Sequence, residues 1–386
     1  MKILIVHNKY QSKNIGGEDI VYKNELESLR KKLGEKNVLS YEVSNDDVNQ
    51  FKLLFEIWFS WEHYKNIRRM VEENRINIVH VHNFFPMLTP SVFKAAKEGG
   101  AKVIHTLHNY RLWCISGILY RDGYGTCEVC TKNKFSLAGI LNRCYRNSLL
   151  QSIAAQLAFW FYKVTGVFDS VDYFFVLTDF QKEKVKSLGI SENRIIAKPN
   201  SLRIPLELQK QKEKQGYIYV GRLEESKGIY ELLKVWSRLD RRFVLTVIGG
   251  GKLERELKNK FMGCDNVIFK GVCTREETLE NMAKSKYLIQ PSLWYETFGL
   301  TIIEAMSVGT PVIGFDIGTR KDFIKNGVNG FLCTPSTFEE TIRMSLEYPE
   351  YDTLSQNAMK TAKLYHDDYI IEQQIEAYKK ILEERI

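Results

Sequence analysis

The stretch that decides the fold runs from residue 290 to residue 312 and reads QPSLWYETFGLTIIEAMSVGTPV. Its two carboxylates, Glu296 and Glu304, are separated by seven residues, with Gly299 between them. A helix that starts near Gly299 or Leu300 keeps Glu296 in the preceding loop, places Glu304 in its first turns and offers free N–H groups to an anion. One carboxylate can then bind a sugar hydroxyl while the other accepts bonds from a ribose diol. The alternative is an amphipathic helix with an ordinary surface glutamate.

A second informative stretch, residues 220–228, reads VGRLEESKG and falls between a predicted strand and a predicted helix. Gly221 lets the backbone approach a ligand closely, and Arg222 and Lys227 offer two cations to a diphosphate. The alternative is that both charges are merely solvated.

Short apolar runs alternate with helix-patterned segments along the whole chain, as in parallel α/β sheets. The predicted strands are Ile3–Val6, Asn77–Val81, Lys102–Thr106, Tyr173–Leu177, Tyr217–Val220, Phe243–Ile248, Val267–Phe269, Tyr287–Gln290 and Pro311–Gly314. The predicted fold class is therefore α/β with two Rossmann-like domains, residues 1–200 and 201–386, divided near residues 198–214. Apolar residues at a helical period from about Asp368 predict a last helix. This helix could pack in the second domain or cross back to pack against the first.

With their flanks, the two motifs resemble the signature of the family 4 retaining glycosyltransferases, also called glycosyl transferases group 1. The resemblance covers most of the chain and is specific in residues 221–228 and 296–311. It implies the GT-B fold, in which two facing Rossmann-like domains have a cleft between them. The N-terminal domain would then bind the acceptor, and the C-terminal domain would bind the nucleotide-sugar donor.

The resemblance also assigns roles to residues of the second half. It gives Glu296 to the donor sugar hydroxyls, Glu304 to the ribose, and Arg222 and Lys227 to the donor pyrophosphate. The backbone N–H groups of Phe298, Gly299 and Leu300 would join Glu296 at the sugar and phosphate.

Candidates in the first half follow predicted strands. The Gly16–Gly17 pair comes after the first strand, where backbone amides can face phosphate, and the family has a similar glycine-rich loop there. His108, in the run IHTLHNYR from residue 104, is the match to a family histidine that contacts the donor sugar. His82 is a similar candidate on the acceptor side, with a core histidine as the alternative.

The implied activity is a metal-independent, retaining, hexosyltransferase-type transfer. The donor would be a nucleotide-sugar, with UDP favoured at the family level, and the acceptor a glycan or lipid-linked glycan in cell-surface polysaccharide biosynthesis. No carboxylate nucleophile is identified, so front-face attack is favoured, with His108 orienting the sugar. Two alternatives are a sugar-nucleotide 2-epimerase, which needs no acceptor, and a non-catalytic sugar-nucleotide scaffold with a degenerate site.

Charge and hydropathy indicate where the protein acts. Lys and Arg number 28 against 20 Asp and Glu in residues 1–200, and 27 against 27 in the remainder. The basic N-terminal half could bind an anionic surface, such as a lipid leaflet or a pyrophosphate-linked acceptor. The alternative is a solvated basic surface with no partner. We see no secretory signal and no membrane-spanning stretch, which predicts a cytoplasmic protein. In one interpretation it acts at the cytoplasmic face of a membrane. We expect no nucleic-acid partner. The aromatic segment 51–69 predicts either membrane contact or a helix packed on the sheet.

Four of the seven cysteines cluster in an insertion at about residues 112–146. Cys114, Cys127, Cys130 and Cys144 have a spacing that suits a tetrahedral thiolate site for structural zinc. Separate buried thiols and redox chemistry are the alternatives. Catalysis itself requires no cofactor in this interpretation.

Overall fold

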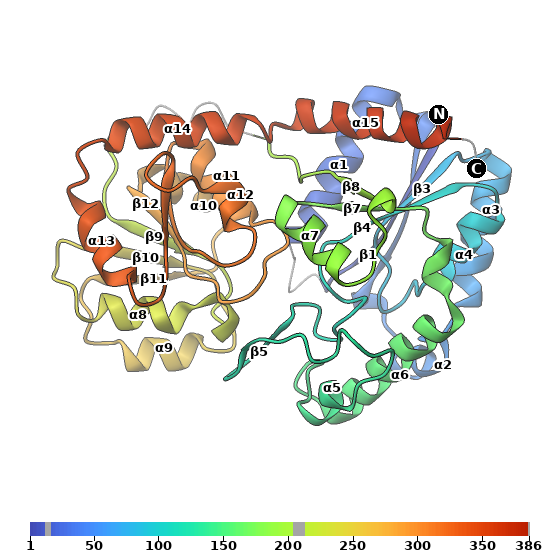
Figure 1. Ribbon diagram of the computed structural model, residues 1–386, viewed down its shortest axis with the longest axis horizontal. Coiled ribbons are helices and arrows are strands. Elements are labelled where there is room, and N and C mark those ends of the chain that lie inside the picture. The colour runs from blue at the N-terminus through green and yellow to red at the C-terminus, as the bar shows by residue number, and fades with distance from the viewer. Residues whose placement is uncertain (12–16, 204–212, 385–386) are drawn as a thin grey trace. The chain divides into compact units, whose positions relative to one another are not determined.

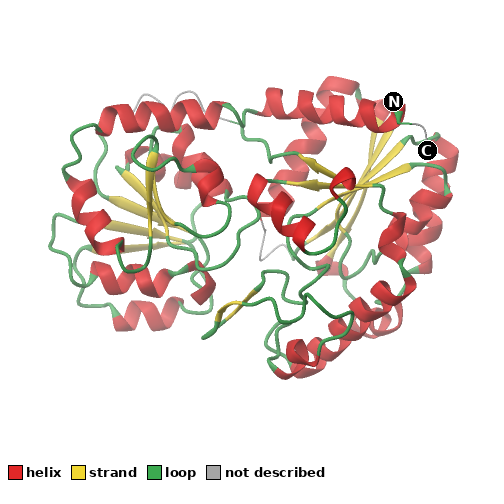
Figure 2. Cartoon of the chain, in the orientation of Figure 1, coloured by secondary structure: helices red, strands yellow, loops and turns green. Residues whose placement is uncertain are grey.

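The computed structural model describes residues 1–11, 17–203 and 213–384. The chain forms two compact units. Unit 1 contains residues 1–119, 127–201 and 367–386, and unit 2 contains residues 120–126 and 202–366. This division differs from a single cut after residue 200 in two places, the short segment 120–126 and the C-terminal segment. Each unit is a layered α/β structure with strands between helices (Figure 2).

Unit 1 is built on a six-stranded sheet in the order β2-β1-β3-β4-β7-β8, and all of its strand pairs are parallel. The strands are β1 Ile3–Lys9, β2 Val38–Ser44, β3 Ile78–Asn83, β4 Lys102–Thr106, β7 Tyr173–Val176 and β8 Ile195–Ala197. The helices are α1 Gly17–Leu33, α2 Gln50–Glu56, α3 Trp61–Asn74, α4 Ser91–Glu98, α5 Leu137–Leu141, α6 Leu149–Thr165, α7 Asp179–Ser187 and α15 Asp367–Glu383.

The C-terminal helix α15 packs in unit 1, beside α1 (Figure 1). It buries Ile371, Tyr378 and Ile381 in the same core as Ile3 and Ile5 of β1. Of the two placements that the sequence left open for the last helix, the structure has the return to the first domain. The reason is the apolar stripe of α15, which completes a core built around the first strand.

Unit 2 has a second parallel six-stranded sheet in the order β11-β10-β9-β12-β13-β14. The strands are β9 Tyr217–Val220, β10 Leu245–Ile248, β11 Val267–Gly271, β12 Tyr287–Gln290, β13 Val312–Phe315 and β14 Gly330–Cys333. The helices are α8 Ile229–Trp236, α9 Glu254–Lys260, α10 Arg275–Lys284, α11 Leu300–Ser307, α12 Arg320–Phe323, α13 Phe338–Leu346 and α14 Tyr351–Lys363. The sheet and helices enclose one large core around Trp236, Tyr217 and Tyr287.

A small hairpin from the cysteine-bearing insertion belongs to unit 2. Its strands are β5 Tyr120–Arg121 and β6 Gly125–Thr126. The Glu225 carboxylate accepts hydrogen bonds from the Gly123 N–H at 2.5 Å and from the Tyr120 hydroxyl at 3.3 Å. The hairpin is thus tied to the loop that follows β9.

Two parallel sheets with covering helices confirm the predicted α/β fold class. The sequence patterns missed three strands of these sheets, β2, β8 and β14, and each of these is an edge strand. Edge strands have one neighbour instead of two, so they are not obliged to form the continuous apolar run that identifies a central parallel strand. β2, which reads VLSYEVS, shows this.

The aromatic segment 51–69 forms the two helices α2 and α3 rather than one. α3 buries His63, Ile67 and Val71, whereas Trp61 is 64% exposed and contacts the rings of Phe59 and Tyr64. The aromatic side chains at the start of α3 therefore contact one another in tilted and edge-on arrangements. Within the described ranges, every helix is too short or too polar to cross a bilayer.

Candidate active site

Four loops of unit 2 follow β9, β10, β12 and β13, and they meet at the carboxyl edge of the sheet, where open α/β sheets bind ligands. Their backbones pack closely. A Cβ on Gly228 would lie 1.9 Å from the carbonyl oxygen of Pro291, and a Cβ on Gly249 would lie 2.0 Å from that of Gly221. Gly228 also has a φ of 69°, a left-handed conformation that glycine adopts without strain. These glycines let the loop 221–228 lie against its neighbours.

Glu296 lies in the loop after β12 and is 7% exposed. Its Oε1 accepts hydrogen bonds from Lys227 Nζ at 2.9 Å and from Ser292 Oγ at 2.6 Å. Lys227 Nζ also lies 5.0 Å from the centre of the Trp294 ring. Burial alone would raise the pKa of Glu296, but the charges of Lys227 and Arg320 lower it to about 2. The carboxylate is therefore ionised at neutral pH and can accept bonds from hydroxyl groups.

Arg320, at the start of α12, is a functional candidate that the sequence analysis missed. Its side chain is fully buried, and it donates to the carbonyl oxygens of Phe315 and Ser292, each at 2.6 Å. Burial lowers the pKa of Arg320 to about 10, while the charge of Glu296 opposes this. A cation in this position fixes two of the four loops and supplies a counter-charge for Glu296. Its only sequence signal is its place just after a strand.

Helix α11 begins as predicted, at Leu300, after Gly299 with a φ of 102°. Glu304 lies within its first two turns, and its Oε1 is 3.4 Å from Arg275 Nε. Burial raises the pKa of Glu304, although Arg275 opposes the rise. The Phe298 ring packs against those of Phe323 and Tyr365, so only the backbone of Phe298 can serve a ligand.

The two cations of the loop 221–228 have different surroundings. The side chain of Lys227 is 17% exposed and paired with Glu296. The side chain of Arg222 is 61% exposed, with Nη1 3.2 Å from Glu224. Unit 2 thus brings Lys227, Glu296 and the N-terminus of α11 together, with Arg222 on the same loop at the surface.

In unit 1, Gly16 lies outside the described residues, and Gly17 is the first residue of α1. The next residue, Glu18, accepts a hydrogen bond from the Tyr10 hydroxyl at 3.0 Å. Burial raises the pKa of Glu18 to about 8, although the bond from Tyr10 opposes this. The phosphate-binding role of the glycine pair stays a prediction.

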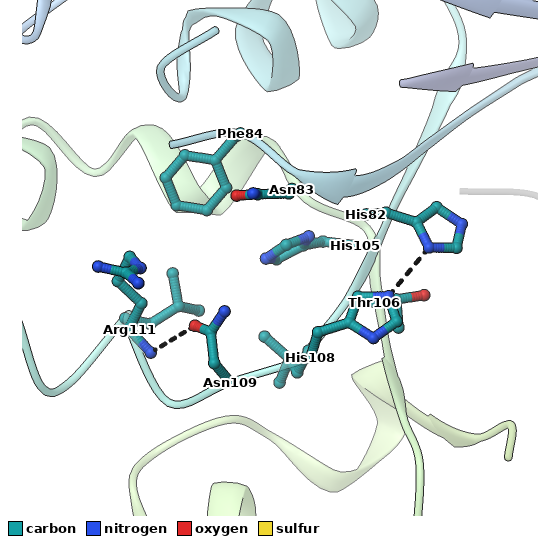
Figure 3. A pocket seen from close by; sticks show the side chains of 10 residues that line it. His82, Asn83, Phe84, His105, Thr106, His108, Asn109 and Arg111 are labelled. Atoms are coloured by element: carbon teal, nitrogen blue, oxygen red, sulfur yellow. Dashed lines mark hydrogen bonds between the residues drawn. The ribbon is translucent and has the colours of Figure 1, made fainter. Parts of the chain in front are cut away.

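His82 and His108 follow one another in a chain of hydrogen bonds at the carboxyl edge of the unit 1 sheet. His82 Nδ1 is 2.9 Å from His108 Nε2 (Figure 3), and His82 Nε2 is 3.1 Å from Glu25 Oε1. Both also line a pocket with Asn109 and Arg111. His82 is 1% exposed, whereas His108 is half-buried. His108 is therefore the outer member of the pair, and both ring nitrogens of His82 have partners inside the protein.

Glu25, on the buried face of α1, anchors this chain. Its Oε2 pairs with Lys198 Nζ, just after β8, and its Oε1 also accepts from Gln374 of α15 at 2.6 Å. Burial would raise the pKa of Glu25, but Lys198 and the bond from His82 lower it well below its usual range. Glu25 is then an ionised acceptor, so His82 Nε2 must be the donor. The bond between His82 Nδ1 and His108 Nε2 occupies that nitrogen of His108, whichever ring donates, and fixes the orientation of the His108 ring.

The buried glutamate and lysine were missed because each falls in an otherwise ordinary pattern. Glu25 occupies a helix position on the buried face of α1, where an apolar residue is the normal choice, and that mismatch was the available signal. The ligand atoms of Glu25, His80 and His82 lie within 4.8 Å of one another, as a metal site requires. The cation beside Glu25 is instead the Lys198 ammonium, and His80 bonds to the hydroxyls of Tyr378 and Thr106, each at 2.6 Å. The donor set fits a hydrogen-bonded ion pair better than a metal ion.

The four clustered cysteines are half-buried thiols that form no disulfide. Burial raises the pKa of Cys130, and charge on Cys114 or Cys127 would raise it further, so these three thiols are electrostatic neighbours. Among the described residues, no three of the four sulfurs lie within 4.8 Å of one another. Zinc binding at this cluster stays a prediction.

Comparisons with known proteins agree with this fold. The family model described as Glycosyltransferase Family 4 matches residues 32–202, and the one described as Glycosyl transferases group 1 matches residues 202–362. An uncharacterised glycosyltransferase of Haemophilus influenzae is 30% identical over 222 residues, 55% of this chain and 61% of that protein. The O-antigen chain mannosyltransferase C of Escherichia coli is 25% identical over 178 residues, 44% of this chain and 47% of that protein. The chain thus spans between about half and three fifths of the length of these relatives.

The structure of Anabaena HepE in complex with UDP has a TM-score of 0.65 and 16% sequence identity, and the match covers 98% of this chain and all of that one. The fold is therefore that of the GT-B glycosyltransferases. Since the two family models together match residues 32–362, the chain belongs to glycosyltransferase family 4.

Acid should destabilise unit 1. Burial lowers the pKa of five histidines of this unit, His7, His63, His80, His105 and His108. Below pH 6.5 these histidines therefore bind more protons in the unfolded chain than in the folded one. As the pH decreases, the free energy of unfolding decreases by up to about 1.4 kcal/mol per pH unit for each histidine. Urea unfolding at pH 7.5 and 5.5 measures this. A unit 1 transition equally stable at both values would contradict it.

The close approach at Gly228 predicts a large difference between two glycine substitutions. In Gly327→Ala, at a φ of 72° with nothing within 4 Å of the new Cβ, we expect only the left-handed strain of about 1–2 kcal/mol. In Gly228→Ala, at a φ of 69°, the Cβ would also overlap Pro291, so the loss should exceed that of the control by roughly 2 kcal/mol. Urea denaturation of both variants compares the two, and equal losses would show that the loops are not tightly packed.

Proposed function

We propose that the protein is a retaining glycosyltransferase that moves a sugar from a nucleotide-sugar, with a UDP-sugar favoured, to a glycan or lipid-linked glycan in cell-surface polysaccharide biosynthesis. The observation that supports this best is the Lys227–Glu296 pair beside the N-terminus of α11. It gives one edge of unit 2 a fixed cation, a fixed anion and free backbone donors. The Escherichia coli relative, named as a mannosyltransferase of an O-antigen chain, is consistent with the acceptor class.

The roles follow from the chemistry of a nucleotide-sugar. The pyrophosphate is anionic, so Lys227, Arg222 and the N–H groups of Gly299 and Leu300 would bind it. The sugar is neutral and rich in hydroxyl groups, and the ionised Glu296 would accept hydrogen bonds from them. Glu304 would take the ribose diol, since it faces the same edge from within α11. UDP bound to HepE, a protein with the same fold, supports a uridine donor.

The transfer we propose is a front-face displacement. The bond between the anomeric carbon and the donor phosphate breaks, a bond from that carbon to the acceptor oxygen forms on the same face, and the acceptor proton passes to a phosphate oxygen. Lys227 and Arg222 would stabilise the charge that develops on the departing diphosphate. These two cations would neutralise the departing diphosphate without a divalent metal ion, so we propose metal-independent catalysis.

His108 would bind the donor sugar as a neutral imidazole. Burial, together with any charge on His82, lowers the pKa of His108 well below its usual value, so it acts through hydrogen bonds rather than charge. Glu25 and His82 would position it. Because His82 has partners at both ring nitrogens, we assign it to positioning His108, and the acceptor contact predicted for it remains untested.

Nucleotide binding tests the proposal without knowledge of the acceptor. UDP, GDP, ADP and dTDP are compared by the thermal unfolding midpoint, and we expect UDP to stabilise the wild-type protein, by about 2.7 kcal/mol at 100 times its dissociation constant. Glu304→Ala should reduce this shift, because the ribose loses its acceptor. The matched control is Glu280→Ala, an exposed glutamate on α10.

The possible outcomes of that panel separate the alternatives. Stabilisation by no nucleotide at millimolar concentration would contradict the donor site. Binding without transfer to any glycan extract would favour a scaffold, and a 2-epimerised nucleotide-sugar would reveal an epimerase. If transfer occurs, the anomeric configuration of the product, measured by NMR, decides between retention and inversion.

We also propose structural zinc at the cysteines of the insertion, for which Cys114, Cys127, Cys130 and Cys144 supply a chemically suitable donor set. About one zinc per chain is expected by elemental analysis. Cys127→Ser and Cys130→Ser should lose it, whereas Cys264→Ser and Cys273→Ser, half-buried cysteines of unit 2, should retain it. Zinc-free wild-type protein that stays free of zinc after incubation with the ion would contradict the proposal.

A further inference from the structure

Residues 129–168 of unit 1 contain no aspartate or glutamate but five cations, Lys132, Lys134, Arg143, Arg146 and Lys163. This run of 40 residues supplies a large part of the net charge of +8. It includes α5, α6 and the segments before and between them, and the two helices pack on each other (Figure 1). We refer to the exposed side of this segment as the α5–α6 face.

Helix α6 is apolar on two opposite sides. One side is buried in unit 1 through Ser152, Ala155, Phe159 and Tyr162. The opposite side has Leu150, Leu157 and Val164 in line at intervals of seven residues, and Leu150 is 78% exposed and Val164 54% exposed. Soluble surface helices normally turn a polar side to water, so an apolar outer side indicates a partner there.

Neighbouring apolar side chains widen this surface. On α5, Leu137 and Leu141 lie one turn apart and are 61% and 74% exposed. Trp160, 40% exposed on α6, contacts the ring of Phe135, which precedes α5. The segment therefore exposes apolar side chains from both of its helices.

The cations of the α5–α6 face flank these leucines in the sequence. Lys132, Lys134, Arg143 and Arg146 are all exposed. Within the part of the chain that the structure describes, none of the four is in an ion pair with an acidic side chain. Arg146 instead lies over the ring of its neighbour Tyr145, 5.3 Å from its centre. Their charge is thus directed to solvent or to a partner.

We propose that the α5–α6 face docks unit 1 on an anionic lipid bilayer, with its leucines and Trp160 in the interface and its cations at the headgroups. Helices that lie in a membrane interface combine leucine and tryptophan on one side with lysine and arginine beside them. Each such cation near an anionic leaflet adds about a kilocalorie per mole of attraction. A second copy of this chain fits less well, because a two-fold contact would bring the same cations together.

The biological role of this docking surface rests on the proposed function, because a lipid-linked acceptor is presented at a membrane. It also places the membrane contact elsewhere than in the aromatic segment 51–69. Vesicle binding itself requires neither donor nor acceptor. The two proposals can therefore fail separately.

Co-sedimentation with vesicles tests the docking surface. We expect the full-length protein to bind vesicles of phosphatidylglycerol and phosphatidylcholine and to bind pure phosphatidylcholine much more weakly. Leu141→Ser/Leu150→Ser should weaken partitioning roughly tenfold or more through lost apolar burial. Arg143→Gln/Arg146→Gln should weaken it about thirtyfold on anionic vesicles.

The matched control is Met262→Ser/Val272→Ser, which removes two apolar side chains of unit 2 that are 83% and 80% exposed, and it should bind vesicles as the wild-type protein does. Equal binding by the leucine variant and the wild-type protein would overturn the proposal, as would a concentration-dependent dimer that the leucine variant abolishes. Unchanged thermal unfolding midpoints of the leucine and arginine variants, measured without ligand, show that each is folded. Loss of vesicle binding alone then concerns the docking surface and not the donor site.

Discussion

Each sheet of this protein is built from parallel strands, and that constraint decides where chemistry can occur. A parallel connection must return along the face of the sheet, so the loops that follow the strands all meet at one edge. In unit 2 this brings together Lys227, Glu296 and the N-terminus of α11, which come from the loops after β9 and β12. Close backbone contacts at Gly228 and Gly249 hold the loops in place. The site is therefore a product of topology before it is a product of any single residue.

Both candidate regions use buried charge for positioning. In unit 2 the buried Arg320 joins two loops and stabilises the ionised form of Glu296. In unit 1 the Glu25–Lys198 pair orients His82, and His82 orients His108. A buried ion pair contributes little net stability, because desolvation offsets the attraction, but losing one partner is costly. Its benefit here is that the outer group, Glu296 or His108, is held in one protonation state and one orientation.

The two units differ in the kinds of side chain that they expose. Unit 1 contains the acid-free segment 129–168 with its exposed leucines and cations, whereas unit 2 contains the candidate donor residues Lys227 and Glu296. The proposed transfer from a nucleotide-sugar to a lipid-linked acceptor would use both kinds of surface. The short hairpin 120–126 belongs to unit 2 although the flanking insertion belongs to unit 1, so the insertion contributes to both units.

The sequence by itself determined the α/β class, the central strands, the start of α11 and the candidate donor residues, because apolar runs, glycines and motif spacing are local features. It did not reveal the edge strands β2, β8 and β14, of which β2 mixes polar with apolar residues and β8 spans only three residues. Only the tertiary structure decided that α15 completes the core of unit 1 and that Arg320, Glu25 and Lys198 are buried beside the candidate residues. Glu25 and Lys198 are separated by 173 residues, and no local pattern encodes a contact across that distance, because it exists only once the sheet has formed.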